Sequence, residues 1–324
     1  MRRSFVLLAG ALLAGALAAP AVADGSPGSG GFTLEDPRIT ESSGLAASRA
    51  HPGVYWTHND SDDGAFLYAV DGRSGRTVAT VTLSGVGTPR DVEAISVGPD
   101  GHLYVGDIGD NLGGTWDHVW IYELPEPKQL KDQTVRATQY DVKYADGARD
   151  AEALMVHPKT GRVYIVSKNE EGGGLYEGPA ELSAARTNTF ERVGDIGLWV
   201  TDGAFSPDGG QLAVRGYFGG VSYDWNNGKP KRQGRLSVPL QGQGESMTYT
   251  PDGATLLYGS EGAGSSVEAK DAPGGDGKSS SGGGGSAGGG DGEDGSGGDF
   301  RMGAIALAAA FAVVYGLKRL FRRG

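Results

Sequence analysis

The chain of 324 residues contains no cysteine. This absence excludes a disulfide scaffold, a thiol nucleophile, a Cys-ligated zinc or iron–sulfur site, and a lipid anchor on an N-terminal cysteine. Basic residues are outnumbered, since 29 Lys and Arg face 40 Asp and Glu, for a formal net charge of −11. That balance argues against a nucleic-acid partner, which needs a basic surface. Glycine, in contrast, supplies 58 residues, about 18% of the chain where roughly 7% is usual.

The first 23 residues have the features of a secretory signal peptide. Two arginines follow the initiating methionine, an apolar run extends from Phe5 to Ala19, and Ala21-Val22-Ala23 supplies a small-residue cleavage site. An uncleaved anchor helix would need a longer apolar stretch. The sequence therefore predicts export, cleavage after Ala23, and a flexible N-terminus over residues 24–31.

Residues 300–321 are predicted to form a transmembrane helix. Met302 to Leu317 is almost entirely apolar, and counting on to Phe321 gives twenty residues, or about 30 Å of helix, which matches the hydrocarbon core of a bilayer. Four Lys and Arg residues follow Leu317 and place the basic tail, residues 322–324, in the cytoplasm by the positive-inside rule. We expect a single-pass protein of the cell membrane with its folded body outside. A buried core helix is the alternative.

Residues 271–299 are predicted to be a disordered linker between body and anchor. In this stretch 14 of 29 residues are Gly and six are acidic, so it cannot bury enough apolar surface to offset the entropy of ordering. Seven of the basic residues belong to the signal peptide and the C-terminal segment. Residues 24–300 therefore contain 22 basic and 40 acidic residues, a net charge of −18. An outward-facing body of this charge attracts cations and repels polyanions.

Residues 32–270 contain one repeated unit, built from a polar residue, a short apolar strand, a turn and a second apolar strand. Its anchor positions are Ser43, Glu93, Glu152, Thr201 and Glu245, at spacings of 50, 59, 49 and 44 residues. A period of 40–60 residues with several strands in each unit is typical of a β-propeller. Pro-Asp-Gly turns separate the two strands in three units, because Pro presets φ and Gly accepts a positive φ.

Two further strands are expected in most units. Third strands are predicted at Phe66–Val70, Val119–Leu124, Gly174–Glu177 and Val221–Trp225, and fourth strands at Thr77–Leu83, Thr134–Tyr144, Thr189–Val193 and Arg235–Pro239. The last unit lacks an outer strand, which the N-terminal strand Phe32–Ile39 can supply, so that the ring closes and no sheet edge is left open. We expect five blades, or six if the 59-residue spacing hides a degenerate one. An open β-sandwich is the alternative fold.

Polar residues gather where first strands start and second strands end, and in a propeller these points share one mouth of the central channel. The predicted ligand-binding residues are Asn59, Asp60, Asp91, Asp107, Asp110, Asn111, Asp150, Asn169, Arg215 and Glu245. Acids this close raise one another's pKa or require a cation. Ca²⁺ is the first candidate, since it takes six to eight oxygen ligands, with Glu93, Glu152, Asp202 and Glu245 as its predicted ligands. The alternative is that these acids cap turns and accept backbone hydrogen bonds.

The chain resembles a family of exported bacterial β-propeller proteins. The resemblance rests on Ser43-Gly44-Leu45-Ala46-Ala47-Ser48, His58-Asn59-Asp60-Ser61, Arg90-Asp91-Val92-Glu93-Ala94-Ile95, Gly106-Asp107-Ile108-Gly109-Asp110-Asn111 and Gly244-Glu245-Ser246-Met247. Members of this family are described as WD-repeat-like or as related to the esterase-like propellers of phytases. The resemblance covers residues 32–268 and implies an architecture rather than a chemistry.

Two functions remain open from the sequence. The first is a surface-tethered binding module that offers an acidic face to an extracytoplasmic protein or glycan. The second is an exported metal-dependent hydrolase, of phytase, lactonase or glycosidase type, in which Glu93 and Glu152 are the catalytic pair. A fold alone does not choose between them.

Overall fold

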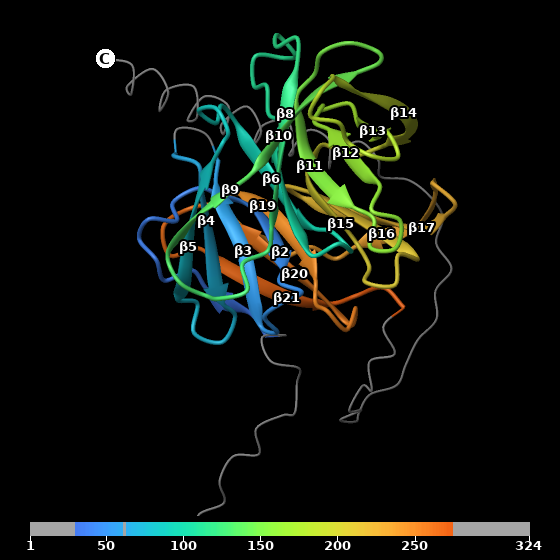
Figure 1. Ribbon diagram of the computed structural model, residues 1–324. Coiled ribbons are helices and arrows are strands. Elements are labelled where there is room, and N and C mark those ends of the chain that lie inside the picture. Colours follow the sequence, from blue (N-terminus) through green and yellow to red (C-terminus); the bar gives the residue numbers. More distant parts are fainter. Residues whose placement is uncertain (1–29, 61–62, 275–324) are drawn as a thin grey trace, which may run out of the picture.

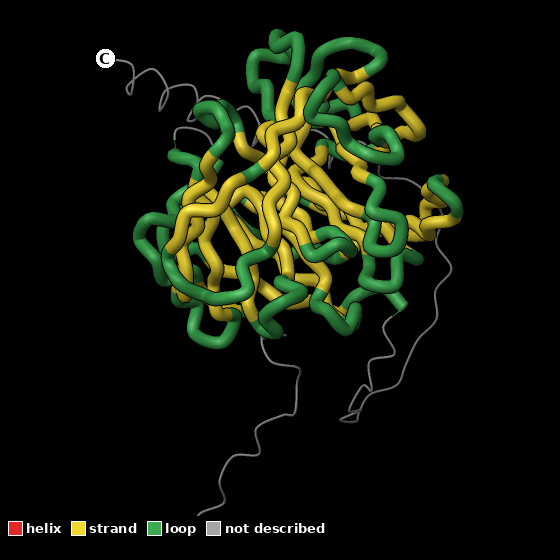
Figure 2. The backbone as a smooth tube through the Cα atoms, in the orientation of Figure 1, coloured by secondary structure: helices red, strands yellow, loops and turns green. Residues whose placement is uncertain are grey.

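The structure is a computed structural model that describes residues 30–60 and 63–274. The predicted signal peptide, transmembrane helix and basic tail, with nearly all of the predicted linker, lie outside these residues. Within the described ranges there are strands and turns and no α-helix, and hence no helix long and apolar enough to span a membrane. Figure 2 shows this all-β composition.

The strands follow one another as antiparallel meanders, in which each strand pairs with the next along the chain. The meanders, each of which we call a sheet, contain, in order, β2 (Ser42–Ala47), β3 (Val54–Asn59), β4 (Phe66–Asp71) and β5 (Thr77–Ser84); β6 (Val92–Val97), β7 (His102–Asp107), β8 (Val119–Pro125) and β10 (Thr138–Tyr144); β11 (Ala151–Val156), β12 (Val163–Ser167), β13 (Gly173–Glu177) and β14 (Asn188–Ile196); β15 (Val200–Phe205), β16 (Gln211–Gly216), β17 (Gly219–Asn226) and β18 (Lys229–Leu236); and β19 (Gly244–Tyr249), β20 (Thr255–Ser260), β21 (Ser266–Asp271) and β1 (Phe32–Thr33). β10 also pairs in parallel with β14, so that the second and third meanders are hydrogen-bonded to each other at their outer strands.

The first strands of these meanders, which we call the inner strands, lie next to one another in a closed cycle. β2 contacts β6, β6 contacts β11, and the sequence continues through β15 and β19 back to β2. In Figure 1 these strands lie at the centre of the molecule. The sheets are thus arranged as a β-propeller, and the predicted all-β propeller fold is confirmed.

The apolar core is divided into clusters that lie between neighbouring sheets. Trp56 and Tyr122 belong to the cluster between the first two sheets, and both are fully buried. A further cluster joins the last sheet to the first through Phe32, Leu34 and Leu257. Each sheet therefore buries both of its faces, because strand residues point alternately to the two sides.

The N-terminal strand lies at the outer edge of the last sheet. β1 pairs antiparallel with β21, with Phe32 opposite Val267, and the Leu34 amide donates to the Ser265 carbonyl at 2.9 Å. The position agrees with the prediction, although the strand is two residues long rather than eight. Gly75 fits beneath this segment, because a Cβ there would lie 1.7 Å from the Thr33 carbonyl oxygen.

Two predicted outer strands were wrong in extent. The stretch predicted as Thr134–Tyr144 forms two strands: β9 (Gln133–Arg136) pairs parallel with β5 of the preceding sheet, and only β10 joins β8. The strand predicted at Arg235–Pro239 is β18, Lys229–Leu236, because a turn at Asn227 and Gly228 starts it earlier. β9 and the long loop of residues 108–118 also account for the 59-residue spacing.

Every inner strand carries a β-bulge at its anchor residue. The pairing register shifts at Ser43 with Gly44, and at Glu93, Glu152, Thr201 and Glu245 in the other inner strands. A bulge leaves one residue unpaired and redirects its side chain. The repeat found in the sequence is therefore a repeat of bulges, and all five anchor residues are at most 3% exposed.

Candidate functional site

The candidate site lies at the end of the ring where the inner strands begin and the second strands end. We call this end the polar mouth. Three of the five anchor residues, Glu93, Glu152 and Glu245, place buried carboxyl groups there. The other two anchors use their hydroxyls to bind neighbouring inner strands: Ser43 donates to a carboxyl oxygen of Glu93 at 2.9 Å, and Thr201 donates to the Gly244 carbonyl at 3.0 Å.

Three carboxyl groups converge on one side of the polar mouth. One oxygen from each of Asp60, Asp91 and Glu93 lies within 4.8 Å of the others. A side-chain hydrogen bond joins Asp60 to Asp91, and this bond needs a shared proton because both groups are carboxyls. Gly109 makes room for them, since a Cβ there would lie 2.7 Å from an oxygen of Asp91 and of Glu93. We call these three residues the carboxyl cluster.

Burial is the main cause of the abnormal titration of the cluster. Burial raises the pKa of Asp91 to about 6, opposed by its hydrogen bond with Asp60 and supported by the charges of Asp150 and Asp107. Burial also raises the pKa of Glu93 well above its usual range, and the charges of Asp60, Glu152 and Asp91 add to the effect. The ionised forms are therefore costly unless a cation is present.

A second group surrounds the only lysine among the described residues of the polar mouth. The Lys168 ammonium donates a hydrogen bond to Glu152 and lies 5.6 Å from the centroid of the Tyr217 ring. Burial raises the pKa of Glu152, and Lys168 opposes the rise. Tyr217 forms a hydrogen bond with Glu245, whose Oε2 has no hydrogen-bond partner in the described chain. Lys168 is thus paired with one anchor carboxyl, Glu152, and its charge also opposes the rise in the pKa of Glu93 and of Glu245.

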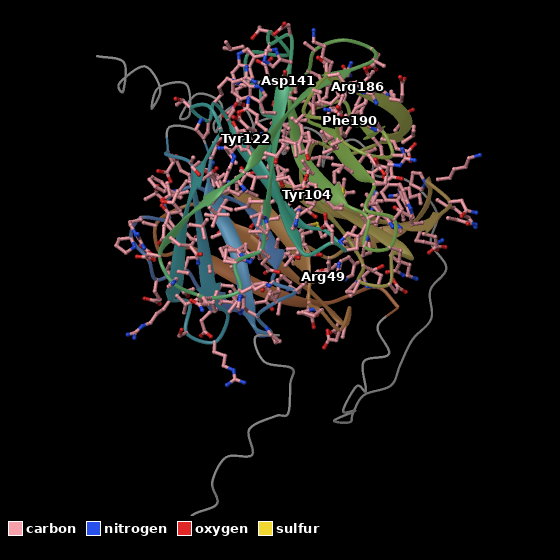
Figure 3. The ribbon with its side chains drawn as sticks, viewed as in Figure 1. Arg49, Tyr104, Tyr122, Asp141, Arg186 and Phe190 are labelled. Carbon is pink, nitrogen blue, oxygen red and sulfur yellow. The ribbon has the colours of Figure 1, made fainter. Side chains whose placement is uncertain are left out.

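Several predicted ligand residues hold the backbone of the polar mouth. Asp107 accepts hydrogen bonds from the amides of Arg90 and Asp91 and from the Tyr122 hydroxyl, at 3.0, 2.9 and 2.5 Å. Tyr122 comes from β8, as Figure 3 shows. Asp107 is fully buried, and this carboxylate therefore connects the start of β6 to the outer part of its own sheet.

The loop after β7 is held in a similar way. Asp110 accepts from the Trp116 amide at 2.7 Å and from the Thr115 hydroxyl at 3.1 Å. The Asp110 amide donates to Asp150 at 2.8 Å, and burial raises the pKa of Asp150. Asn111 reaches the carboxyl cluster, because its side-chain amide donates to Asp91 at 3.0 Å.

The two remaining predicted amides also bind the backbone. Asn59 Oδ1 accepts from the backbone amides of Thr40 and Glu41. Asn59 Nδ2 donates to the Arg38 carbonyl and to the Asp63 carboxylate. Asn169 is exposed, and its side chain accepts from the Glu171 amide at 2.9 Å.

Asp202 and Arg215 lie between the last two inner strands. The two oxygens of Asp202 accept from the amides of Gly203 and Met247 at 2.7 and 2.6 Å. Arg215 is fully buried and donates to the carbonyls of Ser246 and Gly259 at 3.1 and 3.0 Å. Both residues thus stabilise the junction of β15, β16 and β19.

Sequence reasoning did not single out Gly109 and Tyr217 as site residues. Gly109 lies inside the string Gly106–Asn111, but nothing in that string shows that two carboxyls contact it. Tyr217 lies in the tight turn between β16 and β17, and no local sequence pattern indicates that its ring lies near Lys168. Large apolar side chains are also exposed on loops of this end: Leu112, Phe218 and Leu240 are 66%, 40% and 92% exposed.

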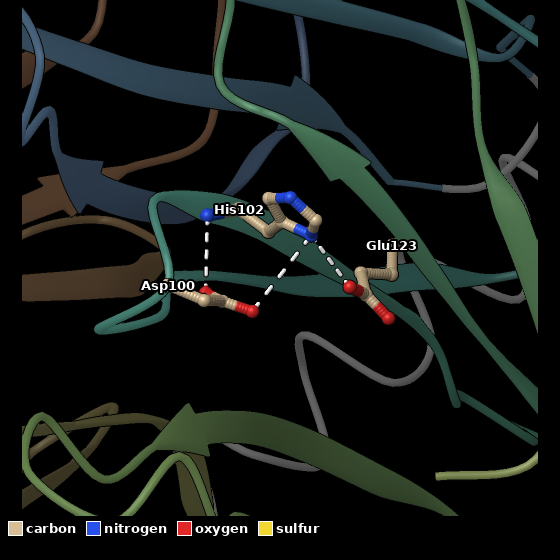
Figure 4. A group of neighbouring side chains, drawn as sticks. All are labelled: Asp100, His102 and Glu123. Atoms are coloured by element: carbon tan, nitrogen blue, oxygen red, sulfur yellow. Dashed lines mark hydrogen bonds and ion pairs between the residues drawn. The ribbon is translucent and has the colours of Figure 1, made fainter.

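A separate polar group lies on β7 and β8, away from the polar mouth. His102 Nδ1 is 2.5 Å from Glu123 Oε1 and 3.7 Å from Asp100 Oδ2, as Figure 4 shows. Tyr140 and Tyr104 donate to the same two carboxylates, at 2.5 and 2.8 Å. Asp100 also accepts from the His102 amide at 3.1 Å and so caps its own turn. These contacts stabilise the turn and the β7–β8 pair.

No protein-family model matches the chain, and a comparison with curated protein sequences finds no match. Solved structures with a similar overall arrangement include a PQQ-bound aldose sugar dehydrogenase from Streptomyces coelicolor, at 12% identity and a TM-score of 0.43 over 76% of this chain and 100% of that one. A gluconolactonase from Xanthomonas campestris is 17% identical, with a TM-score of 0.44 over 75% and 80%. The WD40 repeats of RRP9 are 9% identical, with a TM-score of 0.41 over 76% and 99%. At these values the similarities carry no inference about activity.

Proposed function

We propose that this protein is a membrane-tethered, extracytoplasmic binding module, a five-bladed propeller that binds an extracytoplasmic protein or glycan at its polar mouth. The closed cycle of inner strands supports the count of five blades. The leader, the Gly-rich linker and the basic-ended apolar segment in the sequence support export and tethering. Exposed Leu112, Phe218 and Leu240 border the polar mouth and offer apolar contact area to a partner.

The observation that carries the proposal is the excess of carboxyl groups over cations at the polar mouth. Neither Asp91 nor Glu93 has an ammonium or guanidinium within ion-pair distance among the described residues. Neutralisation must come from protons or from a bound cation, because three carboxylates this close repel one another. A ligand that brings positive charge or hydrogen-bond donors therefore gains from binding here.

Ca²⁺ fits the donor set of the carboxyl cluster. Asp60, Asp91 and Glu93 offer only oxygen atoms and would hold the ion, and water would complete its six to eight ligands. Of the other predicted ligands, Asp202 has both oxygens bound by backbone amides and Glu152 is paired with Lys168. When bound, the ion would supply the positive charge that the cluster lacks.

The test is thermal unfolding of the full chain in lipid nanodiscs, in EDTA and in millimolar CaCl₂. A ligand bound only by the native state stabilises it by RT ln(1 + [L]/Kd), about 2.7 kcal/mol at a hundredfold excess over Kd. We expect calcium to raise the melting temperature and the Glu93→Gln/Glu152→Gln double variant to lose this response. The matched control is Glu181→Gln/Glu191→Gln, two exposed acids. An unchanged melting temperature in the unsubstituted chain would refute the calcium site.

A hydrolase is the second candidate, because Glu93 and Glu152 differ in their environments. Glu93 has acids around it and accepts a hydrogen bond from the Ser43 hydroxyl, whereas Glu152 has the Lys168 ammonium as its partner. A glycosidase needs such a pair, one acid kept protonated and one ionised. Turnover of chromogenic glycosides, phosphate esters or lactones that the double variant abolishes, with folding intact, would favour this function over binding.

A further inference from the structure

A cavity lies at the end of the ring opposite the polar mouth. Its volume is about 310 Å³, at the lower end of the range for small-molecule sites. The last residues of the inner strands line it, together with the turns that follow them. No residue of the carboxyl cluster lines this cavity, so it is distinct from the polar mouth.

Most residues that line the cavity are apolar, although polar atoms make up nearly half of the wall surface. Residues from all five inner strands line it, among them Leu45, Ile95, Val97, Phe205 and Met247. Phe205 and Val97 are half-buried, and an apolar ligand that covers them would remove this surface from water, which favours binding. Two lining hydroxyls are engaged, since Ser96 accepts from the Val156 amide at 3.0 Å and Ser48 donates to Glu126 at 2.5 Å. The hydroxyl of the lining residue Tyr249 has no hydrogen-bond partner in the described chain.

Arg49 is the one charged residue among the described residues that line the cavity. Its guanidinium donates to the Gly98 carbonyl at 3.1 Å and has no ion-pair partner in the described chain. The neighbouring Glu126 carboxylate is engaged by other donors, namely the Ser48 hydroxyl, the Ala50 amide and the Trp56 indole. Arg49 therefore keeps donors for an anion.

The acids of the nearby Pro-Asp-Gly turns form hydrogen bonds within their own turns. Asp208 accepts from the Ser206 hydroxyl and the Gly210 amide, at 2.6 and 3.0 Å. Asp252 accepts from the Thr250 hydroxyl and the Ala254 amide, at 2.6 and 3.1 Å. Both carboxylates cap their own turns, and neither lines the cavity. Arg49 is exposed, so an anion in the cavity can reach its guanidinium from solvent.

We infer that this cavity is a second binding site, which takes a small apolar molecule that carries one carboxylate. The apolar part lies against Phe205, Met247 and Ile95, and the carboxylate accepts charge-assisted hydrogen bonds from Arg49. Arg49 gives the site its preference for anions, because the walls alone would accept any apolar molecule of suitable size. Figure 3 labels Arg49 on this side of the ring.

The test is calorimetric titration of octanoate into the full chain in nanodiscs, with empty nanodiscs as the blank. We expect saturable binding of one octanoate per chain. Loss of one charge-assisted contact should weaken binding roughly tenfold, both in the Arg49→Gln variant and when octan-1-ol replaces octanoate. Arg73→Gln, which removes an exposed arginine on the β4–β5 turn, should bind octanoate like the unsubstituted chain.

Filling the cavity tests its location. Ala204→Leu and Ala47→Leu each add bulk to a small, half-buried lining residue, and each should reduce binding of octanoate and octan-1-ol alike. The inference is overturned if the unsubstituted chain binds no octanoate above the blank, if Arg49→Gln binds it unchanged, or if both filled variants retain full affinity. The affinity of Arg49→Gln for octanoate tests the inference even if a filled variant does not fold.

Discussion

The carboxyl cluster makes a prediction in which the sign of a pH effect is opposite to the usual one for an acid. The pKa of Asp91 is about 6 in the folded chain against 3.8 for a free aspartate. The native state therefore binds more protons than the unfolded state between these values. Its stabilisation by the protonated carboxyl is complete below about pH 4 and is lost as the pH rises through about 6.

The Asp91→Asn substitution removes this titration and preserves the shape of the side chain. The difference of about two pKa units corresponds to about 3 kcal/mol at 1.36 kcal/mol for each unit. Because Asp91 shares its proton with Asp60, we expect the variant to be more stable than the unsubstituted chain by about 1–3 kcal/mol at pH 7.5 in EDTA. At pH 4 the two chains should unfold at nearly the same denaturant concentration.

The assay is urea unfolding of both chains at pH 4, 5, 6 and 7.5, with and without CaCl₂. Asp71→Asn is the control with the opposite sign, since hydrogen bonds from Ser74 lower the pKa of Asp71. That variant should lose stability at neutral pH, and the loss should shrink as the pH falls below 4. If Asp91→Asn is less stable than the unsubstituted chain at pH 7.5 in EDTA, the ionised carboxylate is favoured by the fold and the reasoning fails.

Three further predictions concern stability, each measured as the urea midpoint of unfolding. Glu126→Ala should cost about 2–4 kcal/mol, because it leaves two buried donors, the Ser48 hydroxyl and the Trp56 indole, and one part-buried donor, the Ala50 amide, without an acceptor. Gly244→Ala should cost about 1–3 kcal/mol, since its Cβ would lie 1.8 Å from the buried guanidinium of Arg215; Gly234→Ala, which meets nothing within 4 Å, should be nearly neutral. Leu34→Ala should cost about 2–5 kcal/mol because this fully buried side chain joins the last sheet to the first; a loss below 0.5 kcal/mol would show that the N-terminal segment does not close the ring.

The inner part of each sheet was predictable from sequence, and the outer part was not. The first two strands of each meander are mostly buried, so they form near-continuous apolar runs that end at marked turns. β18 is mostly exposed, with charged residues along it, and its sequence lacks the apolar alternation that locates a strand. β9 pairs with a sheet that precedes it by some fifty residues, and no local pattern encodes such a pairing.

The location of the candidate site at one end of the ring was predictable from the sequence, but the hydrogen bonds of its individual residues were not. Strand direction alone brings the polar residues to one end, because the starts of inner strands and the ends of second strands must lie together. Which acids remain available depends on backbone amides from distant positions, as when Asp202 is bound by the Met247 amide. Asp107 accepts hydrogen bonds from three donors, whereas Asp91 lies in the carboxyl cluster. The sequence does not distinguish the two residues, because the difference depends on contacts made in three dimensions.

The bulges explain why the repeat is visible although its residues differ in chemistry. A bulge at the start of an inner strand turns one side chain out of the regular alternation, and at Glu93, Glu152 and Glu245 that side chain is a carboxyl. At Ser43 and Thr201 it is a hydroxyl that binds the adjacent inner strand. The fold requires an extra residue at each of these five places but not a charge. Three buried anchor carboxyls, of which only Glu152 is paired with a lysine among the described residues, are therefore not a requirement of the architecture. Their presence at a cost in desolvation is the strongest physical reason to look for a ligand at the polar mouth.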